Sequence, residues 1–223
     1  MEGVIVFDMD GVLVDVTQSY RETIRATVRH FGGPEVSHAR VQDYKNSGGW
    51  NNDFALSQKI LADEGVPVAY DDVVREFNRI FFGENNDGLI LRERWIAEPE
   101  FLSRLEQRNA LCIFTGRMGF EAKISLDRFV PQIRWSMIVA DDNVARSKPA
   151  PDGLLDIMAA HPNTPITYVG DTVDDARSAM AAGVRFVGIA HAANPRHGEV
   201  VKLLKENGAV AVLENVNELE KAL

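Results

Sequence analysis

Apolar runs and helix-period patterns divide the chain into an alternating part and a purely helical part. The first apolar run, 4–7, contains β-branched residues and ends in Asp8 and Asp10, which is typical of a buried parallel strand that stops at a turn. From Pro99 onward, further strands are expected at 111–114, 136–139, 166–169, 185–189 and 210–213, separated by helices at about 99–108, 121–129, 152–160, 173–182, 198–207 and 216–223. This alternation predicts an α/β fold with a doubly wound parallel sheet.

The segment between the first strand and residue 93 shows only helical periodicity. One helix is expected to begin after Asp15 or Thr17, either of which can cap it, and to stop at Gly32; two more are expected at about 52–64 and 71–82. No strand is expected between residues 13 and 110. We therefore predict an α/β core domain formed by residues 1–14 and 93–223, and a small all-helical domain formed by residues 15–92.

Composition narrows the class of protein. The chain has 223 residues, 45% hydrophobic content and a net charge of −9, which disfavours nucleic-acid and anionic-membrane partners. The amino terminus does not resemble a signal peptide, and no segment approaches the about 20 apolar residues of a membrane span, so we expect a cytoplasmic protein. The single Cys112 lies in an apolar run and is interpreted as a buried structural thiol. No particular oligomeric state is indicated.

The first strand end carries two carboxylates. Asp8 and Asp10 are two residues apart on an extended segment, so their side chains point to the same side. Like charges at such short range repel, and a hard divalent cation is the usual remedy. The alternative is that both are solvated acids at a strand end.

Three later stretches place polar groups at the ends of other strands or in a loop. Thr115 and Gly116 follow a strand and offer a hydroxyl and backbone N–H groups to an anion, although an ordinary turn explains the pair equally well. Lys148 stands before two prolines that stiffen its loop, and a solvated lysine is the default interpretation. Asp171 and Asp175 follow a strand at a helix start, where acids also complement the helix dipole.

Taken together and in this order, the four stretches resemble the four motifs of the haloacid dehalogenase superfamily. Asp8-Met9-Asp10-Gly11-Val12-Leu13 matches the first motif at each position, and the helical segment after it looks like the type-one cap of subfamily I, as in phosphoglycolate phosphatases and β-phosphoglucomutases. The resemblance covers the whole chain and implies a Rossmann-like core. It also implies a Mg²⁺ site formed by Asp8, the backbone carbonyl of Asp10, Asp171 and Asp175, with Asp175 in direct or indirect contact.

The resemblance further implies a phosphoric monoester hydrolase acting on a small phosphorylated metabolite. In this interpretation Asp8 attacks phosphorus and forms an aspartyl-phosphate, and Asp10 protonates the leaving oxygen and then activates water. Thr115 and Gly116 bind the phosphoryl oxygens, and Lys148 stabilises the transition state. A sugar phosphomutase keeps the same residues and is the alternative within the fold. A non-catalytic ligand-binding protein is the alternative from another class.

Substrate choice is expected to lie in the helical segment. Residues 43–53 are predicted to form a polar, glycine-containing loop, and Lys45, Asn46 and Trp50 are candidates for substrate contacts; a surface turn with Trp50 packed in the core is the alternative. This loop resembles that of a subgroup associated with imidazoleglycerol-phosphate dehydratase, so a histidine-pathway phosphate ester is one possible substrate. The five histidines show no metal-binding spacing and are expected at surface or loop positions.

Overall fold

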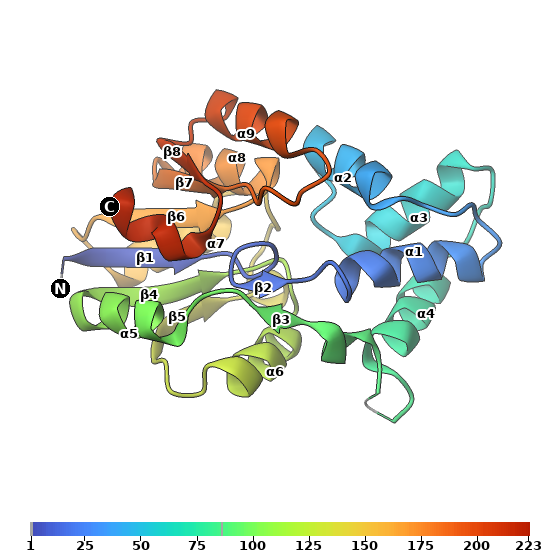
Figure 1. Ribbon diagram of the computed structural model, residues 1–223, viewed down its shortest axis with the longest axis horizontal. Coiled ribbons are helices and arrows are strands. Elements are labelled where there is room, and N and C mark those ends of the chain that lie inside the picture. The colour runs from blue at the N-terminus through green and yellow to red at the C-terminus, as the bar shows by residue number, and fades with distance from the viewer. Residues whose placement is uncertain (1, 86) are drawn as a thin grey trace. The chain divides into compact units, whose positions relative to one another are not determined.

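The computed structural model of the protein describes residues 2–85 and 87–223. The chain divides into two compact units, each continuous in space (Figure 1). The first unit contains the residues up to Val14 together with Trp95–Leu223, and the second unit contains Asp15–Arg94. Met1 of the predicted core domain and Asn86 of the predicted helical domain lie outside the described residues.

The first unit is built on a six-stranded sheet. Each neighbouring pair of strands is parallel, and the spatial order is β5-β4-β1-β6-β7-β8. The strands are β1 (Gly3–Phe7), β4 (Asn109–Phe114), β5 (Trp135–Val139), β6 (Ile166–Gly170), β7 (Arg185–Ile189) and β8 (Ala211–Leu213). The predicted doubly wound α/β fold is therefore confirmed, with the amino-terminal strand inside the sheet.

The register of the sheet aligns the strand ends that carry polar residues. Phe7 of β1 stands opposite Ile113 of β4 on one side and Val169 of β6 on the other. The residues that follow these three positions therefore leave the sheet at the same edge. This alignment brings Asp8 next to the loops that begin at the ends of β4 and β6.

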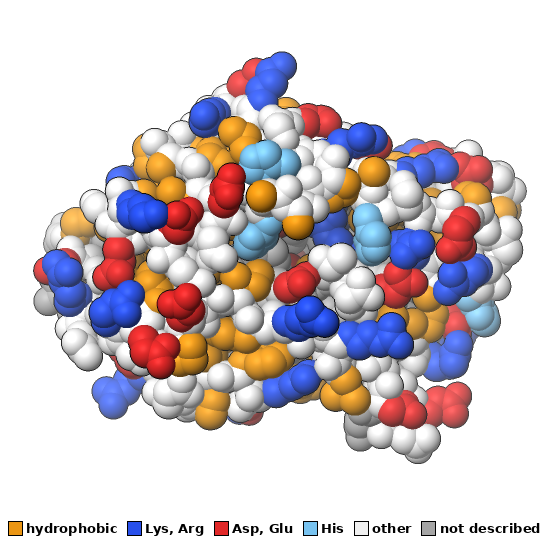
Figure 2. Space-filling view, in the orientation of Figure 1, with side chains coloured by type: hydrophobic (Ala, Val, Ile, Leu, Met, Phe, Trp, Pro, Cys, Tyr) orange, Lys and Arg blue, Asp and Glu red, His pale blue; other side chains and the backbone are white. Residues whose placement is uncertain are grey.

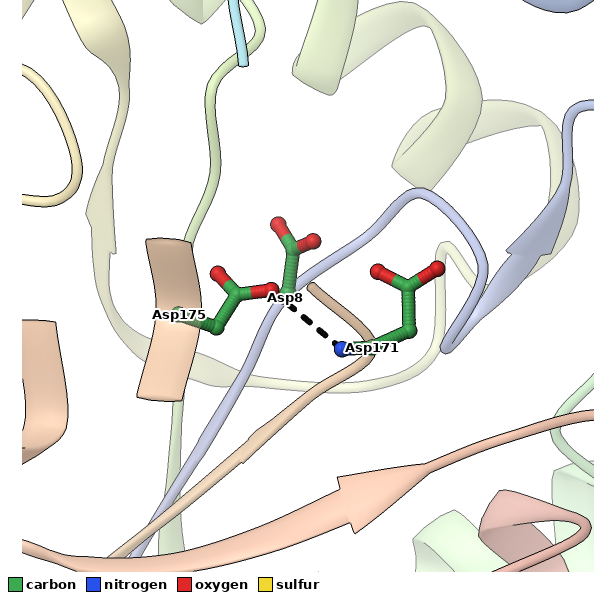
Figure 3. Close-up of side chains that lie close together, drawn as sticks. All are labelled: Asp8, Asp171 and Asp175. Atoms are coloured by element: carbon green, nitrogen blue, oxygen red, sulfur yellow. Dashed lines mark hydrogen bonds between the residues drawn. The ribbon is translucent and has the colours of Figure 1, made fainter. Parts of the chain in front are cut away.

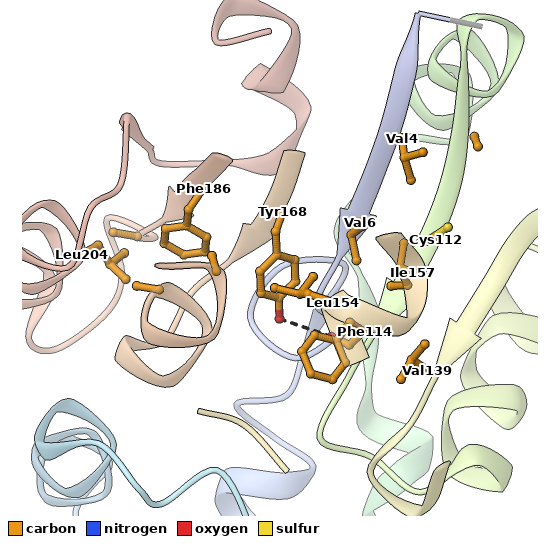
Figure 4. Packing of buried hydrophobic residues seen from close by; sticks show 14 of the residues in the cluster. Val4, Val6, Cys112, Phe114, Val139, Leu154, Ile157, Tyr168, Phe186 and Leu204 are labelled. Carbon is orange, nitrogen blue, oxygen red and sulfur yellow. Dashed lines mark hydrogen bonds between the residues drawn. The ribbon is translucent and has the colours of Figure 1, made fainter. Parts of the chain in front are cut away.

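The core on one face of the sheet is packed with aliphatic and aromatic side chains (Figure 4). Val4 and Val6 of β1 point to this face, because alternate residues of a strand point the same way. Helix α7 adds Leu154 and Ile157, and the buried ring of Tyr168 lies among them. Cys112 is fully buried in the same cluster, which agrees with the interpretation of a structural thiol.

The helices of the first unit begin and end close to the predicted positions. They are α5 (Pro99–Arg108), α6 (Gly119–Phe129), α7 (Asp152–Ala160), α8 (Val173–Ala182) and α9 (His197–Glu206), with short 3-10 helices η2 (Asp141–Asn143) and η3 (Val216–Lys221). The helix predicted at 216–223 is present over Val216–Lys221, as a 3-10 helix and not as an α-helix. Val216 and Leu219 are buried three residues apart, a spacing that suits the three-residue turn of a 3-10 helix equally well.

The second unit is helical. It contains α1 (Tyr20–His30), α2 (His38–Ser47), α3 (Asp53–Asp63), α4 (Tyr70–Phe82) and the 3-10 helix η1 (Leu89–Arg92). Tyr20 of α1 packs against Phe81 of α4 with ring centroids 4.1 Å apart, and Phe54 of α3 lies edge-on to Phe77 at 4.9 Å. These aromatic contacts join three of the helices, because each ring buries a large apolar surface.

Three predictions for this segment are wrong. Residues 43–47, expected in a loop, form the second half of α2, which is capped by Ser37 accepting a hydrogen bond from the backbone of Arg40. Strands also occur between residues 13 and 110, because β2 (Val14–Asp15) and β3 (Arg94–Trp95) form a two-stranded sheet where the chain passes between the units. Neither Asp15 nor Thr17 caps α1 as expected, because Asp15 accepts from the backbone of Thr17 and the helix begins later, at Tyr20.

Acidic and basic side chains are interspersed on the face drawn in Figure 2. Among residues 2–85 and 87–223, no helix combines the length and the apolar character needed to cross a membrane.

Candidate active site

Buried charged groups converge at the carboxyl edge of the sheet. Asp8 follows β1, and its backbone N–H donates to the carbonyl oxygen of Val169 at 2.8 Å, which continues the β1–β6 ladder by one residue. Asp171 and Asp175 follow β6, with Asp175 in the first turn of α8. Lys148 comes from the loop before α7 and is 5% exposed, so this ammonium group is withdrawn from bulk water.

Lys148 bridges two of the carboxylates. Its Nζ donates to Oδ1 of Asp8 at 2.9 Å and to Oδ1 of Asp175 at 2.7 Å. The nitrogen also lies 4.8 Å from the centre of the Phe114 ring, a cation–π distance. A buried ammonium is stable only when such partners replace water, so Lys148 belongs to the same charged cluster as Asp8.

Asp175 accepts hydrogen bonds at both of its carboxylate oxygens. Its Oδ1 accepts from Lys148 and from the Tyr168 hydroxyl at 2.6 Å, and its Oδ2 accepts from the backbone N–H groups of Asp171 and Thr172 and from the Thr172 hydroxyl. Thr172 Oγ1 in turn accepts from the Asp175 backbone, which makes a reciprocal cap at the start of α8. Asp175 therefore fixes the loop that carries Asp171.

The pKa values of the buried carboxylates Asp8 and Asp175 are shifted in opposite directions. Burial raises the pKa of Asp8 to about 7, Lys148 opposes this rise, and the carboxylates of Asp175 and Asp10 add to it. Burial alone would also raise the pKa of Asp175, but Lys148 and the hydrogen bonds to Asp175 lower it below its usual value. One ammonium balances one carboxylate, so Asp175 remains charged. Asp8 requires either a proton or a further cation near neutral pH.

The residues at this position fit a hard cation (Figure 3). Asp8, Asp171 and Asp175 each offer a carboxylate oxygen, and these oxygens lie within 4.8 Å of one another. Carboxylate oxygen is the ligand type that Mg²⁺ prefers. Because both oxygens of Asp175 already accept hydrogen bonds, Asp8 and Asp171 are the better candidates for direct ligands, and Asp175 for a group that orients them.

Gly11 makes room for Asp171. The glycine has φ +74°, and a Cβ atom at this position would lie 2.0 Å from Oδ2 of Asp171. A side chain here would be strained by the backbone and would also displace the carboxylate. The glycine of the first motif is thus explained by close packing against the aspartate of the fourth.

The remaining predicted residues of the core lie at the same edge of the sheet. The Thr115 hydroxyl is buried and accepts from the backbone N–H of Arg117 at 3.2 Å, which leaves its own proton to donate, and Gly116 is half-buried beside it. The Asp10 side chain is not in the carboxylate cluster. Its Oδ1 accepts from Nε of Arg117 at 2.7 Å.

Three further residues contribute to the site and were missed in the sequence. Arg117 directly follows the Thr115-Gly116 pair, and its position in a strand-end loop was the available signal. Tyr168 lies within the β6 pattern and gave no signal apart from its hydroxyl in an apolar run. His191, in the loop after β7, places Nε2 2.9 Å from the carbonyl oxygen of Gly11, so the ring N–H donates there. A histidine interpreted as a loop residue therefore supports the first motif.

The candidates for substrate contacts belong to the helical unit. Lys45 forms an ion pair with Asp53, with Nζ 2.5 Å from Oδ1. Oδ1 of Asn46 accepts from Nε2 of Gln42 at 2.8 Å, and Asn46 is 8% exposed. Trp50 is half-buried, with its ring edge-on to Tyr44 at 6.3 Å.

Comparison with known proteins identifies the family. Residues 5–189 match the haloacid dehalogenase-like hydrolases, and the chain belongs to this family. The expected membership of subfamily I is confirmed, and the chain is an enzyme of the hydrolase class. A solved structure of a haloacid dehalogenase-like hydrolase from Bacteroides fragilis has the same fold, with a TM-score of 0.78 and 20% identity over 98% of this chain and 100% of that chain.

Curated relatives carry several names. An imidazoleglycerol-phosphate dehydratase of Phytophthora nicotianae is 30% identical over 83% of this chain, but the match spans only 42% of that protein. Phosphoglycolate phosphatase 1 of Pseudomonas aeruginosa is 23% identical over 96% of this chain and 77% of the relative. N-acetylmuramic acid 6-phosphate phosphatase of the same species is 25% identical over 86% of both chains. The two phosphatase names agree with the expectation of a phosphoric monoester hydrolase.

Proposed function

We propose that the protein is a Mg²⁺-dependent phosphomonoesterase of the phosphoglycolate phosphatase type, which acts through a phosphoryl group carried on Asp8. The observation that carries this proposal is the position of Asp8. It is a buried carboxylate bonded to Lys148, beside Asp171, with Asp10 two residues further along the chain. This arrangement supplies a nucleophile, a positive charge and a proton carrier within one sheet edge.

In the first step an oxygen of Asp8 attacks phosphorus and the bond from phosphorus to the leaving oxygen breaks. Asp10 gives its proton to that oxygen, because an alkoxide is a poor leaving group. Lys148 stabilises negative charge as it develops, and Thr115 and Gly116 hold the phosphoryl oxygens by hydrogen bonds. The result is an acyl phosphate on Asp8 and a free alcohol.

In the second step water attacks the phosphoryl group and gives a proton to Asp10. The bond between phosphorus and the Asp8 oxygen breaks, and inorganic phosphate leaves. Asp10 thus returns to its protonated form and Asp8 to a carboxylate. Asp171 and Asp8 would hold Mg²⁺, with Asp175 orienting Asp171. The ion supplies positive charge beside the nucleophile and the phosphoryl oxygens.

The substrate class follows from the relatives and the cluster. Relatives of the chain are named for 2-phosphoglycolate, for N-acetylmuramic acid 6-phosphate and for imidazoleglycerol phosphate, so we infer a small phosphorylated metabolite in the cytoplasm. We assign catalysis to residues 1–14 and 93–223. We assign selection among substrates to residues 15–92, through Lys45, Asn46 and Trp50.

Release of phosphate from a panel of esters tests this function. The panel contains the three compounds above and a sugar phosphate with and without its bisphosphate, each with Mg²⁺ and with a chelator. We expect phosphate release that requires Mg²⁺ and is absent in Asp8→Asn. A phosphomutase would instead convert the sugar phosphate only with the bisphosphate. Equal release by Asp8→Asn and the wild type would rule out the assigned nucleophile.

A further inference from the structure

Two nitrogens of the Arg117 guanidinium contact the same oxygen of the Asp10 carboxylate. Its Nε lies 2.7 Å and its Nη2 lies 2.6 Å from the same atom, Oδ1. The second oxygen, Oδ2, forms no hydrogen bond within residues 2–85 and 87–223. The Asp10 side chain is 32% exposed, whereas that of Arg117 is 1% exposed. The Asp10 carboxylate therefore has one oxygen, Oδ1, that is held by Arg117 and one oxygen, Oδ2, that is accessible.

Arg117 is itself held by one hydrogen bond from its side chain and one from its backbone. Nη1 donates to Oγ of Ser125 at 2.7 Å, a buried residue of α6, and the backbone N–H of Arg117 donates to Oγ1 of Thr115 at 3.2 Å. A planar guanidinium that donates from Nε to Asp10 and from Nη1 to Ser125 cannot rotate without losing one of these two bonds. The positions of α6 and of the Thr115 loop therefore determine where Arg117 holds the Asp10 side chain.

We propose that Arg117, anchored by Ser125, is a positioning residue that orients Asp10 so that Oδ2 meets the leaving oxygen and later the attacking water. The inference rests on the proposed phosphomonoesterase function and names a residue that controls one step of it. Arg117 acts on the reaction through Asp10, to which its Nε donates. Its loss should impair proton transfer and leave the attack by Asp8 intact.

Comparing esters with different leaving groups separates a positioning role of Arg117 from a merely structural one. An alkyl ester needs a proton on its leaving oxygen, whereas 4-nitrophenolate departs without one. The value of kcat/KM depends only on the steps up to the first bond cleavage. It therefore measures the need for a proton on the leaving oxygen separately from the later attack of water. In Arg117→Lys we expect kcat/KM for 2-phosphoglycolate, or for the best alkyl ester of the panel, to fall about 100-fold, the typical contribution of general acid catalysis. The value for 4-nitrophenyl phosphate should fall less than about 5-fold.

The second step gives an independent readout. Because Asp10 also accepts the proton of the attacking water, Arg117→Lys should release one equivalent of nitrophenolate per enzyme in a burst, followed by slow turnover.

Ser125→Ala keeps Arg117 but removes the hydrogen bond that anchors it. This variant should show the same difference between the alkyl and nitrophenyl esters, with a smaller loss of kcat/KM. If Arg117→Lys does not fold, as judged by circular dichroism, Ser125→Ala decides alone. The matched control is Arg104→Lys, an exposed arginine paired with Glu220, which should change neither substrate.

Equal losses of kcat/KM on the alkyl and nitrophenyl esters, without a burst, would overturn the positioning role. Unchanged kinetics in Arg117→Lys or in Ser125→Ala would overturn it as well. Failure of the proposed function is a different result, because the wild type would then release no phosphate from any ester, or would release it as fast after Asp8→Asn.

Discussion

The ammonium nitrogen of Lys148 lies 2.9 Å from Oδ1 of Asp8, and both side chains are buried. The same nitrogen contacts Asp175, so one positive charge serves two carboxylates. Replacing Lys148 by Met keeps the length of the side chain and removes the charge. We expect kcat for the best substrate to fall about 10²- to 10³-fold, as when a group that stabilises transition-state charge is lost. Steady-state phosphate release measures this fall.

The matched control is Lys123→Met, which removes an exposed lysine paired with Asp127 on α6. Its effect on kcat should be small, because exposed ion pairs contribute little. A Lys148→Met enzyme as active as the control would show that the bridging charge is not used in the reaction.

Gly11 offers a second test, because its missing Cβ leaves space for Oδ2 of Asp171. In Gly11→Ala the new methyl group must displace that carboxylate, so we expect at least about a 10-fold weaker response to Mg²⁺, as judged from thermal shifts and from activity. Gly183→Ala is the control. It has a similar positive φ of +68° at the end of α8, but apart from its chain neighbours and local helix backbone no atom lies within 4 Å of the added Cβ.

Both substitutions introduce backbone strain, which costs about 1 kcal/mol for a non-glycine residue in the left-handed region. Only Gly11→Ala adds the steric contact with Asp171. The same Mg²⁺ response in the two variants would contradict the proposal that Asp171, beside Gly11, binds the ion.

The pKa of Asp8, which burial raises to about 7, predicts how Mg²⁺ binding depends on pH. Without the ion, the folded protein binds a proton at Asp8 more tightly than the unfolded chain does. The contribution of Asp8 to stability is therefore full at low pH and is lost as the pH rises through about 7. In the proposed site Mg²⁺ would compete with that proton, so the increase in melting temperature on adding Mg²⁺ should be larger at pH 8 than at pH 5.5.

The comparison of wild type with Asp8→Asn isolates this residue from the rest of the cluster. In the absence of Mg²⁺, Asp8→Asn should be more stable than the wild type at pH 8, and the difference should shrink at pH 5.5. Asp127→Asn, an exposed carboxylate of α6, is the control and should keep the wild-type dependence. A Mg²⁺ shift independent of pH would exclude Asp8 as the group that exchanges a proton for the ion.

The helical unit supplies a prediction about selectivity. Lys45 is paired with Asp53, and Trp50 is half-buried against Tyr44. If these residues select the substrate, Lys45→Met and Trp50→Ala should lower kcat/KM for the best natural ester by about 10-fold or more, the value of one hydrogen bond or apolar contact. The value for 4-nitrophenyl phosphate should change little. Lys59→Met, which changes a partly exposed lysine of α3, is the control. Equal losses on both esters would count against a selective role.

Much of the core fold could be predicted from the sequence, because buried parallel strands are short apolar runs with polar residues at their ends. The run before Asp8 and the run before Asp171 both have this form, and the sheet register then brings their ends together. Helix α2 was missed because it lacks such an apolar pattern. Its buried residues are Val41, Gln42 and Asn46, so only one apolar side chain marks the buried face.

The parts of the site that escaped prediction depend on contacts between segments far apart in the chain. Arg117 meets Asp10 across 107 residues, and His191 meets Gly11 across 180. No local pattern specifies such a pair. The two-residue strands β2 and β3 are likewise too short to show an alternation of polar and apolar positions.

Direct detection of a phosphoryl group on Asp8 tests the central claim. The wild type and Asp10→Asn are mixed with 4-nitrophenyl phosphate and Mg²⁺, quenched in acid within milliseconds and treated with borohydride, which reduces an acyl phosphate to an alcohol. Peptides are then analysed by mass spectrometry. We predict reduction at residue 8 that depends on substrate and is greater in Asp10→Asn, where breakdown of the intermediate is slowed. An Asp8 peptide that stays unreduced while phosphate is released would contradict the account.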